Sequence, residues 1–281
     1  KIMVSKNQQK PPYWRINKAA KQIMFSYLHL SLDTIELYYN EIKNRSLPWL
    51  HGYACNIYLL SFLIKEKGLP PLDCVKFVTT GSDNLLDSYR VLIQQVFPRA
   101  KVHQHYGLAE EVANFSEDRN GVIHVDEDFA YVEFIPLSDN EPDLCRIIGT
   151  GFCNPAFPLI RYDTGDIARV QYDEYGKIQV LMIDGRGTEY IKLPGGKRIG
   201  ITGLDNFEYL TKIKAAQYVQ KTLNLIIVRV VKGEGYDEKE ENALLNEIYT
   251  RVPQEVIVKI EYVDEIKRTK SGKIRLIISE I

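Results

Sequence analysis

Long apolar runs are missing from this sequence of 281 residues. The longest, residues 57–64, is interrupted by Ser61 and falls far short of the ~20 residues that a membrane helix needs. We therefore predict no membrane span and assign this run to a buried helix. An excess of charge is missing too, because 36 basic residues face 37 acidic ones and the net charge is −1. The basic residues are spread along the chain, which argues against a nucleic-acid partner.

Cysteine is scarce, and the cysteines present lack a metal-binding spacing. The four are Cys55, Cys74, Cys145 and Cys153, without the paired two-residue intervals of a zinc site. No secretory leader precedes them, so reduced thiols and a cytoplasmic location are expected. We interpret them as small, buried apolar residues.

The sequence does contain enough apolar material for two domains. Hydrophobic residues make up 45% of the chain and charged residues 26%, which allows a sizeable core. We predict an α/β domain of layered sheets and helices over residues 1–186, followed by a small α+β domain over residues 187–281. The division falls at Asp184-Gly185-Arg186-Gly187, where two glycines surround one arginine.

The clearest pattern lies between Val75 and Glu111. Residues 75–80 are an apolar, β-favouring run closed by a glycine, and residues 85–97 carry apolar side chains at helical spacing as far as Pro98. Residues 101–105 form a second predicted strand, and such a unit closes as a right-handed parallel crossover. Both strands then end at one edge, which carries the turns 81–83 and 106–107. Open α/β sheets bind ligands at such an edge, and a nucleotide is a reasonable ligand there by analogy of fold.

The flanking segments complete the predicted elements. Helices are expected over residues 33–44 and after His51-Gly52-Tyr53, and residues 121–137 and 146–152 predict strands of a second sheet. Residues 161–166 are expected to form a turn between two strands, and residues 178–183 a further strand. In the small domain we expect strands at 190–193, within 215–231 and at 256–263, and helices near 204–210 and 237–252. A final strand follows residues 267–275, which by themselves indicate a solvated basic turn.

Four short segments together resemble the adenylate-forming superfamily. They are Tyr106-Gly-Leu-Ala-Glu110, Arg161-Tyr-Asp-Thr-Gly-Asp166, Gly185-Arg186 and Thr269-Lys-Ser-Gly-Lys273, in the order and rough spacing of that family. The stretches YGLAEEVANF, HVDEDFAYVEFIP and NPAFPLIRYDTGD look more narrowly like the phenylacetate-CoA ligase branch, particularly its capsule-biosynthesis members. This resemblance covers nearly the whole chain. It implies an enzyme that uses ATP to convert an organic carboxylic acid, expected to be aromatic, to an acyl-adenylate and then transfers the acyl group to a thiol, usually coenzyme A.

The same resemblance implies nucleotide-binding roles for single residues. Tyr106 would stack on adenine next to Gly107, and the loop Gly81, Ser82 and Asp83 would line the adenine. Asp166 would accept both ribose hydroxyls, with Asp163 as the competing carboxylate, and Arg186 would contact ribose or phosphate. From the residue types alone, a core tyrosine is the favoured interpretation of Tyr106, and the alternatives are a capping residue of a turn for Asp166 and one exposed arginine among many for Arg186.

Two further residues would act on phosphate. Glu110 matches the family's magnesium-binding glutamate, which suits a hard cation that prefers carboxylate oxygen; the alternative is a carboxylate at a helix start. Lys273 matches the lysine that bridges the substrate carboxylate and the phosphate during adenylation. The chain departs from the family at Ala109, where a phosphate-binding hydroxyl is usual, and at Thr188, where the pivot usually has Asp or Lys.

Several alternatives stay open at this point. The family's glycine- and serine-rich phosphate loop would lie upstream of Lys1, so we expect the sequence to omit an upstream region and an internal loop near Gln9-Lys10. The chain could instead be a catalytically impaired homologue that binds adenine nucleotides, or could transfer its acyl group to a sugar or carrier protein. The identity of the acid and the oligomeric state are left open.

The histidines offer a weaker signal. His103 and His105 share one face of a strand and could form a metal pair, but no third ligand is apparent and strand packing is favoured. The resemblance places His29 and Phe25 near the carboxylate pocket.

Overall fold

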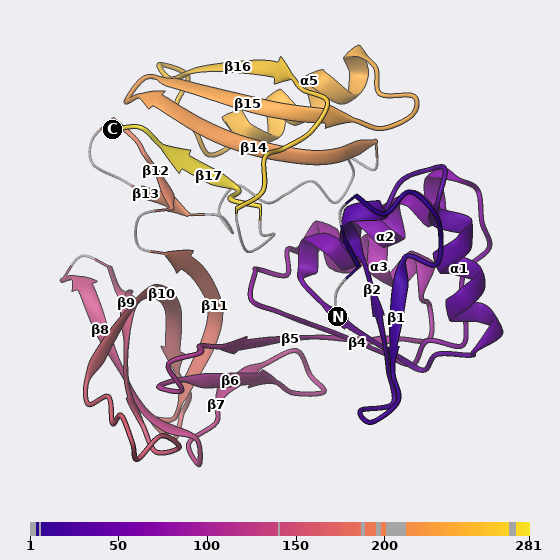
Figure 1. Cartoon of the computed structure of the whole chain (residues 1–281). Coiled ribbons are helices and arrows are strands. Elements are labelled where there is room, and N and C mark those ends of the chain that lie inside the picture. The colour runs from indigo at the N-terminus through magenta and orange to yellow at the C-terminus, as the bar shows by residue number, and fades with distance from the viewer. Residues whose placement is uncertain are drawn as a thin grey trace.

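The computed structural model describes residues 4–5, 7–139, 141–186, 189–194, 198–200, 212–269 and 274–281, and of Arg186 it describes the backbone only. These residues form a larger α/β part followed by a smaller α+β part (Figure 1). The helices of the larger part are α1 (Ile35–Asn44), α2 (Ala54–Glu66) and α3 (Asp87–Val96), with one 3-10 turn at Tyr27–His29.

The predicted strand-helix-strand unit is confirmed. β4 (Phe77–Gly81) and β5 (Lys101–Gly107) pair in parallel, with α3 between them in sequence. A strand that the sequence did not predict, β3 (Trp49–Gly52), pairs in parallel with β4. It has only four residues, between Pro48 and the first turn of α2, so its pairing rather than its own pattern makes it a strand.

A separate two-stranded sheet pairs β1 (Trp14–Asn17) with β2 (Gln22–Phe25). The prediction that residues 121–137 and 146–152 belong to a second sheet is wrong, because their strands belong to one nine-stranded sheet that runs through the larger part. Its order is β3-β4-β5-β6-β7-β11-β10-β9-β8. The added strands are β6 (Asn114–Glu117), β7 (Ile123–Val125), β8 (Ala130–Ser138), β9 (Glu141–Gly151), β10 (Tyr162–Tyr172) and β11 (Ile178–Arg186). The chain reverses after β5 and β6 pairs antiparallel with it, Tyr106 opposite Phe115, which joins the two halves. Figure 1 shows the helices at the β3 and β4 end and the strands β8 to β11 curling away at the other.

Two predicted turns lie inside strands. Tyr106 and Gly107 are the last residues of β5, because their pairing with β6 continues the strand. The segment ending at Asp166 belongs to β10, which pairs with β9 and β11 but loses register against β9 between Asp163 and Ile167. Gly165 has φ +73° within this register shift. The turn-forming residues of the sequence therefore correspond to a β-bulge-like irregularity inside a strand and not to a turn between two strands.

Separate apolar clusters fill the two ends of the sheet. The cluster beneath the helices includes the fully buried Ile35, Leu63, Val78 and Ile93. The curled end encloses a second cluster that includes Phe115, Ile147 and Val180. Both ends of the sheet are therefore anchored independently, and β5 and β6 run between the clusters.

The smaller part holds a four-stranded mixed sheet, ordered β16-β15-β14-β17. Its strands are β14 (Ile213–Thr222), β15 (Leu225–Lys232), β16 (Ile257–Tyr262) and β17 (Ile277–Ser279), close to the predicted positions. Helix α5 (Glu238–Tyr249) begins at Asp237, whose side chain accepts hydrogen bonds from the backbone N–H groups of Lys239 and Glu240. A short hairpin, β12 (Tyr190–Lys192) and β13 (Arg198–Gly200), precedes this sheet. The helix predicted near residues 204–210 lies outside the described residues.

Candidate functional site

A cavity of about 350 Å³ opens where the carboxyl ends of β4 and β5 meet β10, β11 and the smaller part of the chain. That volume lies within the range of ~300–1,000 Å³ typical of small-molecule sites. Its wall from the larger part includes Cys55, Ser82, Asp83, Asn84, Tyr89, Gln104, His105, Tyr106, Gly107, Leu108, Asp166, Ile183 and Gly185. Its wall from the smaller part includes Glu189, Thr269, Ile274, Arg275 and Leu276. The sheet edge at which the sequence predicted a ligand therefore forms part of the wall of this cavity.

Tyr106 and Asp166 form the central pair of this cavity. The Tyr106 hydroxyl donates to Asp166 Oδ2 at 2.8 Å, and the Tyr106 ring packs on Phe115 with centroids 4.8 Å apart. One ring face therefore rests on the core, and the hydroxyl is fixed by a carboxylate from β10. This arrangement brings together two residues that are 60 positions apart and that the sequence singled out.

Backbone geometry holds Asp166 in place. Asp166 is only 7% exposed, and its backbone N–H donates to Thr164 Oγ1 at 3.1 Å. The Thr164 hydroxyl in turn donates to the Ile147 carbonyl on β9 at 2.9 Å. The competing carboxylate, Asp163, accepts from the Gly165 N–H and pairs with Arg146 at the surface. Of the two, Asp166 lines the cavity and Asp163 is absent from the lining residues.

The loop after β4 lies at the cavity, and it also caps the N-terminus of α2, which the sequence did not indicate. Ser82 has φ +68°, and the Asp83 carboxylate accepts from the N–H groups of Ala54 at 2.6 Å and Cys55 at 3.1 Å. Tyr53, the N-cap residue of α2, makes no side-chain cap. Asp83 therefore satisfies the exposed donors of that helix from 29 residues away. Gly81 ends β4 and is not among the lining residues, although its two successors are.

Asn84 attaches the same loop to the far side of the cavity. Its side-chain nitrogen donates to the Ile183 carbonyl on β11 at 2.9 Å. Asn84 and Gln104 were not predicted from the sequence, and His105 was predicted to pack within a strand or to bind a metal rather than to line this cavity. Their position at the carboxyl ends of β4 and β5 could have identified them, because that edge was already predicted to carry the ligand.

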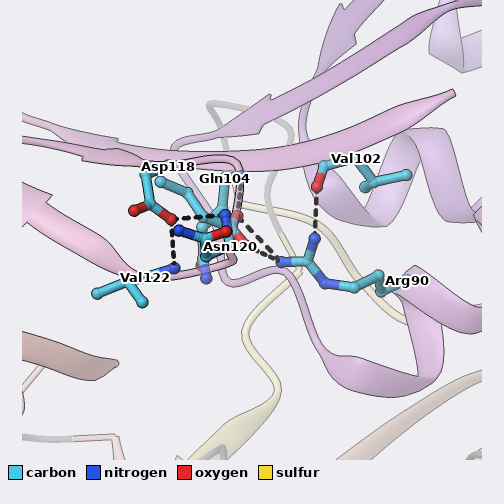
Figure 2. A network of polar contacts seen from close by, with 7 residues as sticks. Arg90, Val102, Gln104, Asp118, Asn120 and Val122 are labelled. Atoms are coloured by element: carbon cyan, nitrogen blue, oxygen red, sulfur yellow. Dashed lines mark hydrogen bonds and ion pairs between the residues drawn. The ribbon is translucent and has the colours of Figure 1, made fainter.

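A buried ion pair supports β5 from beneath. Glu117, whose side chain is 3% exposed, accepts from Arg90 Nη2 at 2.9 and 3.0 Å and from the Gln104 backbone N–H at 2.7 Å. Figure 2 shows Arg90 reaching from α3 toward the Val102 carbonyl and Asp118 turned toward Asn120 and Val122. Since Gln104 lines the cavity, this carboxylate fixes the strand two residues before Tyr106.

Glu110 is not among the residues that line the cavity, and the last lining residue of this segment is Leu108. Glu110 is exposed in the turn between β5 and β6, next to the exposed Ala109. That turn lies directly on β9. A Cβ added to Gly149 would fall 2.1 Å from the Val112 carbonyl oxygen, and one added to Gly151 2.4 Å from that of Glu111. Two glycines on β9 therefore allow the turn to approach.

Cys55 lines the cavity but is not equipped as a nucleophile. Burial raises the pKa of the Cys55 thiol from its ordinary value of 9.0 to about 12, and the neighbouring Asp83 carboxylate adds to the rise. The thiol therefore stays protonated at neutral pH, and only a thiolate attacks efficiently.

The two strand histidines make different contacts. His105 lies 2.6 Å from Asn114 Oδ1, and Gly107 leaves the room for that contact. His103 Nδ1 is buried without a partner among the described residues. The part of the chain that the structure describes contains no group of three His, Cys, Asp or Glu side chains that could hold a metal. His29 stacks on Tyr13 and Phe25 packs near Tyr38, away from the cavity lining.

Two of the positions singled out in the sequence, Lys273 and Thr188, lie outside the described residues. Only the backbone of Arg186 is described, opposite Asp166 in the β10 and β11 pairing. Among the described residues, no helix has the length and apolar character that crossing a bilayer requires.

Comparison with solved structures defines the fold. A 2-hydroxyisobutyryl-CoA ligase in the postadenylation state with R3-HIB-AMP superposes with a TM-score of 0.68 at 18% identity, over 91% of this chain and 59% of that one. The anthranilate CoA ligase AuaEII with anthranoyl-AMP gives 0.64 at 12%, over 87% and 51%. The amide bond synthetase McbA from Marinactinospora thermotolerans gives 0.59 at 16%, over 85% and 54%. The chain has the fold of the adenylate-forming ligases, with a large α/β part and a separate C-terminal part.

Comparison of sequences identifies which proteins with this fold the chain resembles in sequence. Residues 194–280 match the family model of the CapK C-terminal domain. Protein CapK of Staphylococcus aureus is 23% identical over 287 residues, which cover 98% of this chain and 62% of CapK. The resemblance to capsule-type members of the superfamily is confirmed, and the chain spans about three fifths of the length of CapK.

Proposed function

We propose that the protein takes part in ATP-dependent activation of an organic carboxylic acid as an acyl-adenylate. The observation that carries this proposal is the pair of Tyr106 and Asp166 in a cavity at the carboxyl edge of the sheet. An aromatic face supported from behind suits a purine, and a buried carboxylate suits two ribose hydroxyls. Two solved structures of the same fold hold acyl-AMP molecules, which supports the choice of ligand.

The residues indicated by the family resemblance take separate roles in this proposal. Tyr106 stacks on adenine, Gly107 and the loop from Gly81 to Asp83 lie along its edge, and Asp166 binds the ribose. Because Asp83 already holds the N-terminus of α2, its contribution is to fix the loop rather than to bind the base directly. Arg186 would contact ribose or phosphate, and Lys273 would bridge carboxylate and phosphate during adenylation.

The residues fit a magnesium ion bound mainly by substrate. Mg²⁺ in such sites keeps several waters and takes one or two carboxylates together with phosphate oxygens. The exposed carboxylate of Glu110, two residues beyond Leu108 of the cavity wall, would be the protein ligand of such an ion. When bound, the ion would neutralise phosphate charge.

The acceptor and the biological setting belong to the same proposal. We infer transfer to a thiol such as coenzyme A, in the cytoplasm, as a step in capsule or surface polysaccharide synthesis, with an aryl acid as the first substrate to test. An amine, sugar or carrier protein is the alternative acceptor, because one relative of the same fold is an amide bond synthetase. We also propose the division into domains at residues 186 and 187.

Acid-dependent exchange of pyrophosphate into ATP tests the activity. We expect exchange with at least one acid of an aryl panel. Lys273→Ala should slow it by about 10²–10³, because a charge aimed at the transition state is lost, while AMP still binds. Unchanged exchange in this variant would remove the role given to Lys273. Lys267→Ala, at an exposed neighbouring lysine, is the matched control.

A second candidate is a homologue that binds adenine nucleotides without catalysis. Ala109 favours it, because the residue before Glu110 has no hydroxyl to hold phosphate. Saturable AMP binding with no exchange for any acid would establish this candidate over the ligase.

A further inference from the structure

The Arg268 side chain, from the basic segment of the smaller part, contacts three residues of the larger part. Its Nη1 donates to Asn56 Oδ1 at 2.9 Å and lies 3.7 Å from Cys55 Sγ. Its guanidinium carbon lies 5.1 Å from the centroid of the Tyr27 ring, a cation–π distance. Three residues from two segments of the larger part thus surround one side chain from the smaller part. Arg268 itself is not among the residues that line the cavity.

The receiving surface is the N-terminal end of α2. A helix N-terminus carries partial positive charge and does not by itself attract a cation. Here Asp83 offsets that charge, because its carboxylate accepts from the N–H groups of Ala54 and Cys55. The cavity loop and Arg268 therefore meet at the same helix end, where both contact Cys55.

Described residues close to Arg268 in the sequence contribute to the cavity wall. Arg268 and Ile274 form an isolated antiparallel bridge, and Thr269 and Ile274 line the cavity together with Arg275. Arg275 pairs with Glu189 at 3.0 Å, and its carbonyl accepts from Gln217 on β14 at 2.7 Å. The turn is thus attached to the small sheet at one end and to α2 at the other.

We propose that Cys55 and Asn56 at the N-terminal end of α2, together with Tyr27 from the 3-10 turn, form the docking seat for Arg268 and hold Thr269 and Ile274 at the cavity wall. Arg268 is then a positioning residue, which acts through these neighbours and lies five positions before Lys273 in the sequence. Its catalytic consequence rests on the proposed function, whereas the docking itself does not. Loss of the contact would release the turn and uncover Cys55, which is 6% exposed.

Alkylation of Cys55 tests the docking without any assay of activity. N-ethylmaleimide labelling of the full chain is followed by peptide mass mapping, with Cys145, 2% exposed in another cluster, as the internal reference. We expect Arg268→Met to speed labelling of Cys55 relative to Cys145 by about tenfold, the effect of losing one charge-assisted hydrogen bond. Lys267→Met removes the same charge from an exposed neighbour and should change nothing. Arg268→Lys should restore part of the protection through its charge over Tyr27.

The outcomes separate docking from general loosening and from the proposed activity. Equal Cys55 labelling in Arg268→Met and Lys267→Met would overturn the proposal, as would a parallel rise at Cys145. Asn56→Ala should reproduce the effect of Arg268→Met and add little to it in the double variant. In pyrophosphate exchange we expect Arg268→Met to lower kcat with little change in the KM for ATP. Absence of exchange in the wild type would contradict the proposed function while the labelling result still decides the docking.

Discussion

Removal of the Glu117 carboxylate should lower the free energy of unfolding of the larger part by more than a substitution at the surface does. In Glu117→Ala, the Gln104 N–H loses its acceptor and Arg90 loses its counter-charge. Breaking a buried ion pair by removing one partner costs about 3–5 kcal/mol. Because the Arg90 side chain is 30% exposed, water can replace part of the lost contact, so we expect a decrease of about 3 kcal/mol in the free energy of unfolding. Glu117→Gln keeps one acceptor oxygen and should lose about half as much.

Urea unfolding followed by tryptophan fluorescence measures this loss. The chain has two tryptophans, Trp14 and Trp49, and both lie in the larger part. Glu127→Ala, at an exposed glutamate in the turn between β7 and β8, is the control and should stay within about 0.5 kcal/mol of wild type. A loss below about 1 kcal/mol in Glu117→Ala would refute the reasoning, because the carboxylate would then carry no more than an ordinary surface pair.

Three further changes test other features of the site. Asp166→Ala should weaken AMP binding at least tenfold, about the worth of one charge-assisted hydrogen bond, as measured by calorimetry; unchanged affinity would exclude Asp166 as the ribose ligand. Gly149→Ala should cost about 1–3 kcal/mol in thermal or urea unfolding, because the new Cβ meets the Val112 carbonyl, whereas Gly52→Ala should be tolerated since its Cβ would lie 3.4 Å from Ile57. Because the pKa of Cys55 is raised to about 12 in the folded chain, the unfolded chain loses the thiol proton at a lower pH, close to 9, than the folded chain does. Stability should therefore fall by up to about 1.4 kcal/mol per pH unit until about pH 12, in addition to other groups. Cys55→Ala should flatten that decline in melts between pH 8 and 10.5, and Cys153→Ala, at an exposed thiol, should not.

The sequence predicted elements best where the pattern was local. The apolar run of residues 75–80 and the helical spacing of residues 85–97 were enough for β4 and α3, and with the run at 101–105 for β5, whereas Asp166 was indicated by the family resemblance. The single sheet was not predictable in this way, because whether β6 pairs with β5 depends on a reversal at residues 108–113. That reversal needs Gly149 and Gly151 on a strand far along the chain.

The site shows the same limit. Residue types and resemblance indicated Tyr106 and Asp166, but their hydrogen bond is set by the curl of the sheet. Asp83 illustrates a further reason, since its carboxylate serves a helix that begins 29 residues earlier. Arg268 was part of a basic turn that looked solvated, and only the packing of the two parts gave it a partner.

Calorimetric titration with a non-hydrolysable acyl-adenylate analogue, such as an aryl sulfamoyl adenosine, tests the central claim most directly. The account predicts saturable binding to the wild-type protein, at least tenfold weaker in Asp166→Ala and in Tyr106→Ala, which lose the ribose acceptor and the stacking face. Equal binding to all three proteins, or none to the wild type, would contradict the assignment of this cavity to an adenylate.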